Sequence, residues 1–153
     1  MTRKVFMIIN LFKGEHYFLS NFAECEIIDG DLEFPTVEHA YQAMKTDDLA
    51  KKRQISIQST PGKAKRLGQR VPVIDNWEEI KLDVMMELLV KKFSSDNPEL
   101  RQKLIDTEDS DLMEGNTWHD QFWGDCSCNN HAGTDGENWL GKLLMEIREG
   151  LQS

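Results

Sequence analysis

The stretch Thr36-Val37-Glu38-His39-Ala40-Tyr41-Gln42-Ala43-Met44-Lys45 separates a short β region from a chain that is mostly helical after it. Thr36 favours the start of a helix, because its hydroxyl can accept a hydrogen bond from a backbone N–H of the first turn. We therefore predict a helix over Val37 to Met44. Polar residues three, four and seven positions apart share one face of a helix, and here they are Glu38, Tyr41, Gln42 and Lys45.

The residues before this helix have the composition of short strands. The segment Lys4 to Phe12 is rich in β-branched and aromatic residues, which favour a strand. The apolar segments Cys25 to Ile28 and Leu32 to Phe34 flank Asp29-Gly30-Asp31. An Asp-Gly pair between two apolar segments indicates a hairpin, so we predict a small N-terminal antiparallel β element.

Capping residues and apolar spacing predict further helices after Lys45. Proline follows Thr60 and Asn97, and proline favours the first position of a helix. Asn76, with Glu79 three residues later, has the pattern of a capping box. The predicted helices are Asp47 to Ile57, one that starts at Thr60-Pro61 and runs through Lys63 to Gln69, one that begins after Asn76 with the apolar face Ile80, Val84, Leu88, Leu89 and Phe93, one that starts at Asn97-Pro98 and runs through Leu100 to Ile105, and Glu137 to Glu149.

The segment Glu108 to Gly136 shows no clear helical or strand periodicity in its apolar residues, and it contains Trp118 and Trp123. A stretch of this length without regular structure is usually functional or disordered, and two tryptophans argue against disorder. We therefore predict a packed loop that forms part of a site. The predicted fold class is mainly α (α+β): one compact helical domain over residues 1–153 with the small β element near its start.

Composition narrows the classes of function. The net charge is −9 and the isoelectric point is near 4.9, whereas proteins that grip nucleic acid by its phosphates are normally basic. A cluster of basic residues between Lys51 and Arg70 is either the solvated surface of two helices or a phosphate-binding wall. No apolar run is long enough for a membrane span. An odd number of cysteines and the lack of a signal-peptide pattern predict the cytoplasm.

The segment Phe18 to Phe22 sets Ser20 and Asn21 between aromatic residues that would anchor it. Both polar side chains could then hydrogen-bond a ligand, and Glu15 could bind a ribose hydroxyl or a base amino group. A simple turn in which Asn21 bonds the loop backbone explains the same residues. The polar face of the helix at 37–44 also has a second interpretation, an ordinary solvent-exposed helix face. His39 is expected to be structural.

A third group of candidates lies between Trp118 and Gly141. Asp120 could position a water molecule or bind ribose, and Trp123 could stack on a flat base. Gly124 and Asn138 belong to a glycine-rich stretch that would let backbone approach a ligand closely. The alternative is that both tryptophans are core residues.

His119, Cys126, Cys128 and His131 suggest zinc, but a Cys-x-Cys spacing is tighter than the usual gap in structural zinc sites. We therefore expect these to be ordinary loop residues and predict no metal and no other cofactor.

The carboxylate and amine of the helix at 37–44 suggest a chemistry. A carboxylate beside an anomeric carbon stabilises the positive charge that develops when a C–N bond at that carbon breaks. An amine with a lowered pKa could instead attack the carbon and hold the opened sugar as a Schiff base. Glu38 and Lys45 could project into one pocket in this way.

Taken in order, these motifs resemble the NADAR (YbiA-like) family of N-glycosidases over about residues 11 to 150. The resemblance rests on the segments Phe18 to Phe22 and Thr36 to Lys45, on Trp123-Gly124, and on Asn138-x-Leu140-Gly141. The sequence departs from the family at Asp125 to His131, which is longer and more polar than the usual short turn.

The resemblance implies cleavage of a bond between ribose and an exocyclic amine, without a metal or cofactor. The implied substrate is guanine carrying ADP-ribose, as a nucleotide or in weakly bound DNA, or else a ribosylamino-pyrimidine intermediate of riboflavin synthesis. Lys45 resembles the covalent or charge-stabilising group, and Glu38 and Asp120 resemble the acid, base or ribose-holding carboxylates. The implied substrate-binding residues are Glu15, Ser20, Asn21, Tyr41, Gln42, Trp123, Gly124 and Asn138. A binding module for ADP-ribose without catalysis is the remaining alternative.

Overall fold

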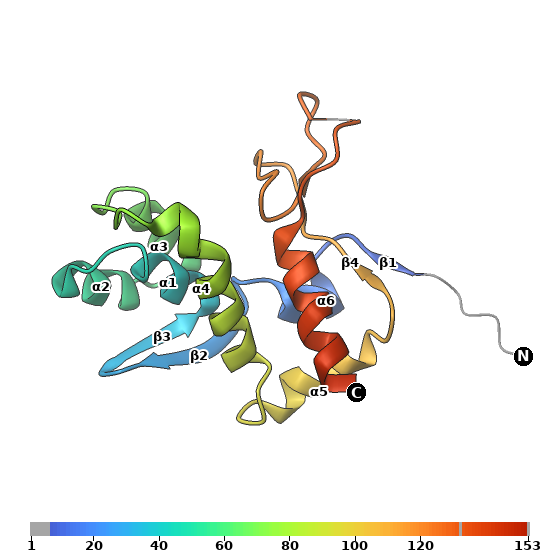
Figure 1. Ribbon diagram of the computed structural model, residues 1–153, viewed down its shortest axis with the longest axis horizontal. Coiled ribbons are helices and arrows are strands. Elements are labelled where there is room, and N and C mark those ends of the chain that lie inside the picture. The colour runs from blue at the N-terminus through green and yellow to red at the C-terminus, as the bar shows by residue number, and fades with distance from the viewer. Residues whose placement is uncertain (1–6, 132, 153) are drawn as a thin grey trace, which may run out of the picture. The chain divides into compact units, whose positions relative to one another are not determined.

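The computed structural model describes residues 7–131 and 133–152 (Figure 1). The chain divides into two compact units. The central unit is Asn21–Pro98, and the terminal unit joins Met1–Ser20 to Glu99–Ser153. Helices dominate and the sheets are small, which confirms the predicted mainly α (α+β) class. The single domain over residues 1–153 stays a prediction.

The central unit begins with the predicted hairpin. Strand β2 (Glu24–Asp29) pairs antiparallel with β3 (Leu32–Thr36), and the pair Asp29–Leu32 leaves a loop of two residues. Gly30 has a φ of 59° in that loop, a conformation that glycine adopts without steric cost. The register shifts by one residue opposite Pro35, which has no N–H to give to the ladder. The hairpin prediction is confirmed.

Helices α1 (Val37–Ala43), α2 (Leu49–Ser56), α3 (Pro61–Gly68) and α4 (Trp77–Lys92) follow the hairpin. The side chains of Thr36, Asp48 and Thr60 accept hydrogen bonds from the first turns of α1, α2 and α3. Helices α1 and α3 begin where capping chemistry predicts, whereas α2 begins at Leu49, after the predicted start at Asp47. The prediction of a capping box at Asn76 is wrong. Asn76 has φ −96° and ψ 15° instead of an extended backbone, and its side chain makes no capping hydrogen bond.

Helix α1 is the centre of this unit. It contacts α2, α3, α4 and both strands of the hairpin, and Figure 1 shows these elements gathered around it. All seven of its residues are buried. The polar residues of α1 are therefore enclosed by protein, and the alternative of an ordinary exposed face is wrong.

Helix α4 turns a slightly different face inward from the predicted one. Ile80 and Val84 are only half-buried. The buried residues Met85, Leu88, Leu89 and Lys92 recur at helical spacing. Lys92 is not among the predicted apolar residues, yet it is fully buried, with its ammonium 5.3 Å from the centre of the Phe93 ring.

The terminal unit contains a 3₁₀ helix, η1 (Gly14–Leu19), and helices α5 (Pro98–Asp106) and α6 (Trp139–Gln152). Strand β1 (Ile8–Ile9) pairs in parallel with β4 (Asp111–Leu112), and β5 (Gly115–Asn116) pairs in parallel with β6 (Asp125–Cys126). Within the described part of the strand predicted over Lys4 to Phe12, only Ile8–Ile9 form a strand, and Lys4 to Phe6 lie outside the described residues. Buried Arg148 fastens α6 by donating to the Thr107 hydroxyl and the Ser110 carbonyl.

No helix in the described part of the chain is both long and apolar enough to cross a membrane. The predicted final helix begins at Trp139 instead of Glu137, and it continues through Gln152.

Alanine substitutions at two glycines of α3 would test how closely this helix packs against α1. A Cβ on Gly68 would overlap the side chain of Gln42, whereas the nearest atom to a Cβ on Gly62 is the Thr60 hydroxyl at 3.9 Å. We expect Gly68→Ala to lower the free energy of unfolding by about 1–3 kcal/mol, since Gln42 must move. We expect Gly62→Ala to be neutral or to raise it by up to about 1 kcal/mol. Urea unfolding measures both, and equal effects would contradict this packing.

Burial of Lys92 predicts a pH dependence of stability. Desolvation lowers the pKa of Lys92 to about 8, and an unfolded lysine has a pKa of about 10.4. Between these values the unfolded chain holds a proton that the folded chain lacks, so stability rises with pH; below about 8 the cost of burying the charge is constant. Between pH 8 and 10.4, the free energy of unfolding of the wild-type chain should rise by up to about 3 kcal/mol relative to that of Lys92→Met. Parallel unfolding curves for the two proteins across this range would refute the assignment.

Candidate active site

Helix α1 holds a buried carboxylate. Glu38 is 7% exposed, and its Oε1 accepts a hydrogen bond of 2.8 Å from Nε2 of Gln42, one turn later on the helix. Gln42 therefore fixes the orientation of the carboxylate. The backbone N–H of Glu38 donates to the carbonyl of Asn21, which ties the predicted Phe18–Phe22 motif to the start of the same helix.

Lys45 lies in the turn that follows α1, so it is not itself helical. Its N–H donates to the Gln42 carbonyl at 3.3 Å, and its carbonyl accepts from Ile74 at 2.8 Å. The side chain is half-buried, with Nζ 5.8 Å from the centre of the Tyr41 ring. Tyr41 in turn packs against Trp77 of α4, with ring centres 5.2 Å apart.

The surroundings of Lys45 change its protonation. Burial lowers the pKa of the Lys45 amine below its ordinary value; the negative charges of Glu38 and Glu78 oppose this, and the positive charges of Lys65 and Lys81 add to it. A lysine in such surroundings has a larger neutral fraction near neutral pH than an exposed one, and the neutral amine is the nucleophilic form.

Two buried acceptors near the start and middle of α1 are unsatisfied. Among the described residues, neither Oδ1 of Asn21 nor Oε1 of Gln42 has a hydrogen-bond partner. Asn21 directs its other end, Nδ2, at the sulfur of Met85 at 3.6 Å. An unsatisfied buried acceptor costs about 1–3 kcal/mol, and such a cost is tolerated where a ligand supplies the missing donor.

His39 is held as a structural residue. Its Nδ1 lies 2.7 Å from the Thr36 hydroxyl and its Nε2 lies 3.0 Å from the Gln58 carbonyl. Burial lowers the pKa of His39, with the Gln58 carbonyl opposing the shift. A neutral ring that donates from Nε2 and accepts at Nδ1 satisfies both partners. Neither ring nitrogen is left for a substrate.

The terminal unit carries the candidates around Asp120. One oxygen of Asp120, Oδ1, accepts from the backbone N–H groups of Phe122 and Trp123 at 3.2 and 2.8 Å. Asn116 bonds the backbone N–H and carbonyl of Asp120 at 3.1 and 2.9 Å. Asp120 thus closes the turn that presents Trp123. The Trp123 ring is half-buried and lies edge-to-face with Phe122 at 4.8 Å.

Gly124 and Asn138 have structural partners that the sequence pattern did not reveal. A Cβ on Gly124 would overlap Glu114, so the missing side chain makes room for protein atoms. Asn138 is buried, with a left-handed φ of 52°. Its amide donates to the Leu112 carbonyl and its oxygen accepts from the Glu114 N–H. Both ends of this side chain therefore fasten the segment between β4 and β5 to the start of α6.

Glu15 and Ser20 lie in and just after η1 of the terminal unit. The Glu15 side chain is 87% exposed and lies 3.9 Å from the ring of His16. Ser20 is half-buried, and its N–H donates to the Tyr17 carbonyl.

The structure thus gathers Glu38, Tyr41, Gln42, Lys45 and Asn21 in the central unit. Asp120, Trp123, Gly124 and Asn138 lie together in the terminal unit. The sequence did not indicate that Trp77 lies beside Tyr41 or that Lys65 lies near Lys45. Trp77 and Lys65 come from α4 and α3, and no spacing along the chain links them to α1.

Comparisons with known proteins identify the family of the chain. The NADAR domain family model matches residues 11–152. N-glycosidase YbiA from Escherichia coli (strain K12) is 41% identical over 135 residues, which are 86% of this chain and 79% of that protein. A riboflavin biosynthesis protein from Vibrio vulnificus (strain YJ016) is 35% identical over 141 residues, 90% of this chain and 36% of that protein.

A solved structure shares the fold. The NMR structure of the Escherichia coli protein YbiA superposes with a TM-score of 0.76 and 32% identity, covering 97% of this chain and 90% of that one. With the family model and the relatives, this structure confirms the resemblance seen in the sequence. The chain belongs to the NADAR domain family and is an N-glycosidase, a hydrolase of N-glycosyl bonds.

Proposed function

We propose that the chain removes ADP-ribose from ADP-ribosylated guanine, as a nucleotide or in DNA, by cleaving the bond between ribose and the exocyclic amine. The observation that carries the proposal is the pairing of a buried carboxylate, Glu38, with Lys45, an amine whose pKa burial lowers. Glu38 lies in the short, fully buried helix α1, and Lys45 lies in the turn that follows it.

In the proposed reaction the neutral Lys45 amine attacks the anomeric carbon as the bond from that carbon to the guanine nitrogen breaks. Glu38, which first takes the proton that leaves the Lys45 amine neutral, gives this proton to the departing nitrogen. The sugar ring then opens as a proton passes from the lysine nitrogen to the ring oxygen, which leaves an iminium bond to Lys45. Water adds to the iminium carbon while Glu38 takes back a proton. Collapse of this adduct frees Lys45 and ADP-ribose, so one water molecule is consumed.

Binding roles follow from the neighbours of this pair. The unsatisfied Oδ1 of Asn21 is suited to accept a hydrogen bond from a ribose hydroxyl or a base amino group. Gln42 is proposed as a positioning residue, since it holds Glu38. Lys65 on α3 supplies a positive charge near Lys45, and we propose that it attracts the diphosphate of ADP-ribose.

The candidates of the terminal unit stay proposals of their own. Asp120 is the second proposed carboxylate, and Trp123 the proposed stacking surface for a flat base. Glu15, Ser20, Gly124 and Asn138 remain predicted substrate-binding residues. Asp120→Asn keeps an acceptor for the turn at 120–123 while it removes the charge, so it separates a catalytic carboxylate from a turn-forming one.

A second candidate substrate, which the family resemblance implied, is supported by the name of a relative. The Vibrio vulnificus protein is named for riboflavin biosynthesis, and its ribosylamino-pyrimidine intermediates present the same ribose-to-amine bond. The chemistry at Lys45 would be unchanged. The two substrates therefore differ only in the leaving group, and a direct comparison of turnover decides between them.

Contact with DNA is proposed to be weak. With a net charge of −9, the chain would recognise a modified base mainly through the lesion, in single-stranded or flipped form. The cytoplasm is the compartment we propose, because an odd number of cysteines fits a reducing environment.

The test is mass-spectrometric product analysis of the purified chain with an oligonucleotide that carries ADP-ribosyl-guanine. We expect free ADP-ribose and unmodified guanine. Lys45→Ala should lose at least about 1000-fold in kcat, because the nucleophile is gone. Lys45→Arg should be equally inactive, since an arginine keeps the charge but stays protonated.

Lys91→Ala is the matched control, because Lys91 lies on the surface of α4 and its Nζ donates to the Ile28 carbonyl at 3.3 Å. It should keep wild-type turnover. Full activity in Lys45→Arg would show that charge, and not a nucleophile, is needed at position 45. No turnover of this substrate, with the riboflavin intermediates cleaved, would move the proposal to the second substrate.

A further inference from the structure

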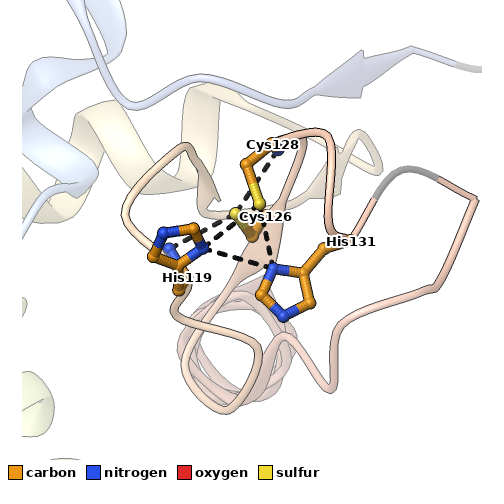
Figure 2. A group of neighbouring side chains, drawn as sticks. All are labelled: His119, Cys126, Cys128 and His131. Atoms are coloured by element: carbon orange, nitrogen blue, oxygen red, sulfur yellow. Dashed lines mark hydrogen bonds between the residues drawn. The ribbon is translucent and has the colours of Figure 1, made fainter.

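The loop of the terminal unit brings together four side chains that the proposed reaction does not use. His119, Cys126, Cys128 and His131 each offer one ligand atom, and these four atoms all lie within 4.8 Å of one another. Figure 2 shows the two imidazole rings turned toward the two sulfurs. Two residues come from the stretch before β6 and its end, and two from the turn that follows.

The distances in this cluster match a tetrahedral ion. Zinc bonds of about 2.0 Å to nitrogen and about 2.3 Å to sulfur separate neighbouring ligand atoms by roughly 3.3 to 3.8 Å. The Nδ1 atoms of His119 and His131 are 3.5 Å apart. The Cys128 sulfur lies 3.2 Å from the first and 3.0 Å from the second. Small shifts of Cys128 would bring all three to tetrahedral spacing.

The backbone around Cys126 supports a thiolate ligand. The buried Cys126 sulfur accepts backbone N–H groups of His119 at 3.3 Å and of Cys128 at 3.4 Å. Hydrogen bonds to the ligand atom stabilise its charged form and orient it, as in the outer shells of metal sites. His119 also has a left-handed φ of 70°, a conformation that is uncommon for residues other than glycine, and its ring faces the sulfurs in Figure 2.

We propose that His119, Cys126, Cys128 and His131 form a structural zinc site. Two thiolates and two imidazoles are a donor set that zinc favours, and four protein ligands leave no open position for catalysis. Binding forms two Zn–S and two Zn–N bonds, and the two thiol protons pass to solvent. A cavity of about 290 Å³ reaches Cys126 and His131 and gives the ion a path from solvent.

The site would brace the loop that carries Asp120 and Trp123. Both residues lie between the ligands His119 and Cys126 in the sequence, and the Cys126 N–H is also held by Oε1 of Gln121 at 2.6 Å. The prediction of no metal rested on the short Cys-x-Cys spacing. The fold brings in the other two ligands, His119 seven residues before Cys126 and His131 three residues after Cys128. The Cys-x-Cys spacing alone does not show that these side chains meet.

Metal analysis of the full chain, purified under non-chelating reducing conditions, tests the proposal whatever the substrate. We expect about one zinc per chain after incubation with Zn²⁺ and desalting. Titration with Co²⁺ should give the intense visible bands of a tetrahedral ion together with thiolate-to-metal charge transfer. Zinc should raise the melting temperature and a chelator should reverse the rise.

Variants locate the site. Cys128→Ser and His131→Ala should each weaken zinc binding by more than about 100-fold, which exceeds the usual effect of losing an outer-shell partner. Cys25→Ser and His16→Gln are matched controls outside the cluster and should bind zinc normally. The wild-type titration needs no variant. No bound zinc in the wild-type chain, or a Co²⁺ spectrum without thiolate bands, would overturn the proposal, as would equal binding by Cys128→Ser.

Discussion

The burial of helix α1 on every side is the constraint on which the central unit depends. A helix of seven residues that includes Glu38, His39 and Gln42 can be enclosed only if its polar atoms find partners, since each unsatisfied group costs about 1–3 kcal/mol. Thr36 and Gln58 satisfy His39, and Gln42 satisfies one oxygen of Glu38. The hairpin, α2, α3 and α4 all contact α1. The packing that encloses this helix therefore also fixes the positions of these elements.

The same constraint creates the chemistry. Enclosure holds the Glu38 carboxylate rigidly through Gln42, and the turn after α1 keeps the backbone of Lys45 bonded to Gln42 and Ile74. The amine is half-buried at the end of this rigid helix, where desolvation lowers its pKa. A preorganised carboxylate and an amine with a larger neutral fraction are what cleavage at an anomeric carbon requires. The remaining unsatisfied oxygens of Asn21 and Gln42 mark the polar cost of the same arrangement.

Most local features were predictable from the sequence, the capping box at Asn76 being an exception, and features that join distant segments were not. The caps at Thr36 and Thr60 and the Asp29-Gly30 hairpin depend on neighbouring residues, and they appear where the sequence predicts them. The burial of Lys92, the packing of Gly124 on Glu114 and the double bonding of Asn138 depend on tertiary contacts. The cluster around Cys126 was judged from spacing alone, and the left-handed turn at His119 that helps to close it leaves no sequence signal. The candidate residues of α1 were identified mainly through a family resemblance.

The most direct test of the account is reductive trapping at Lys45. The chain would be incubated with ADP-ribosylated guanosine in the presence of cyanoborohydride, and its peptides would be analysed by mass spectrometry. We expect a stable ADP-ribose adduct on the peptide that contains Lys45, because reduction fixes the iminium bond. We expect no adduct in Lys45→Arg. Full turnover with no adduct at Lys45 would contradict the covalent role of this amine.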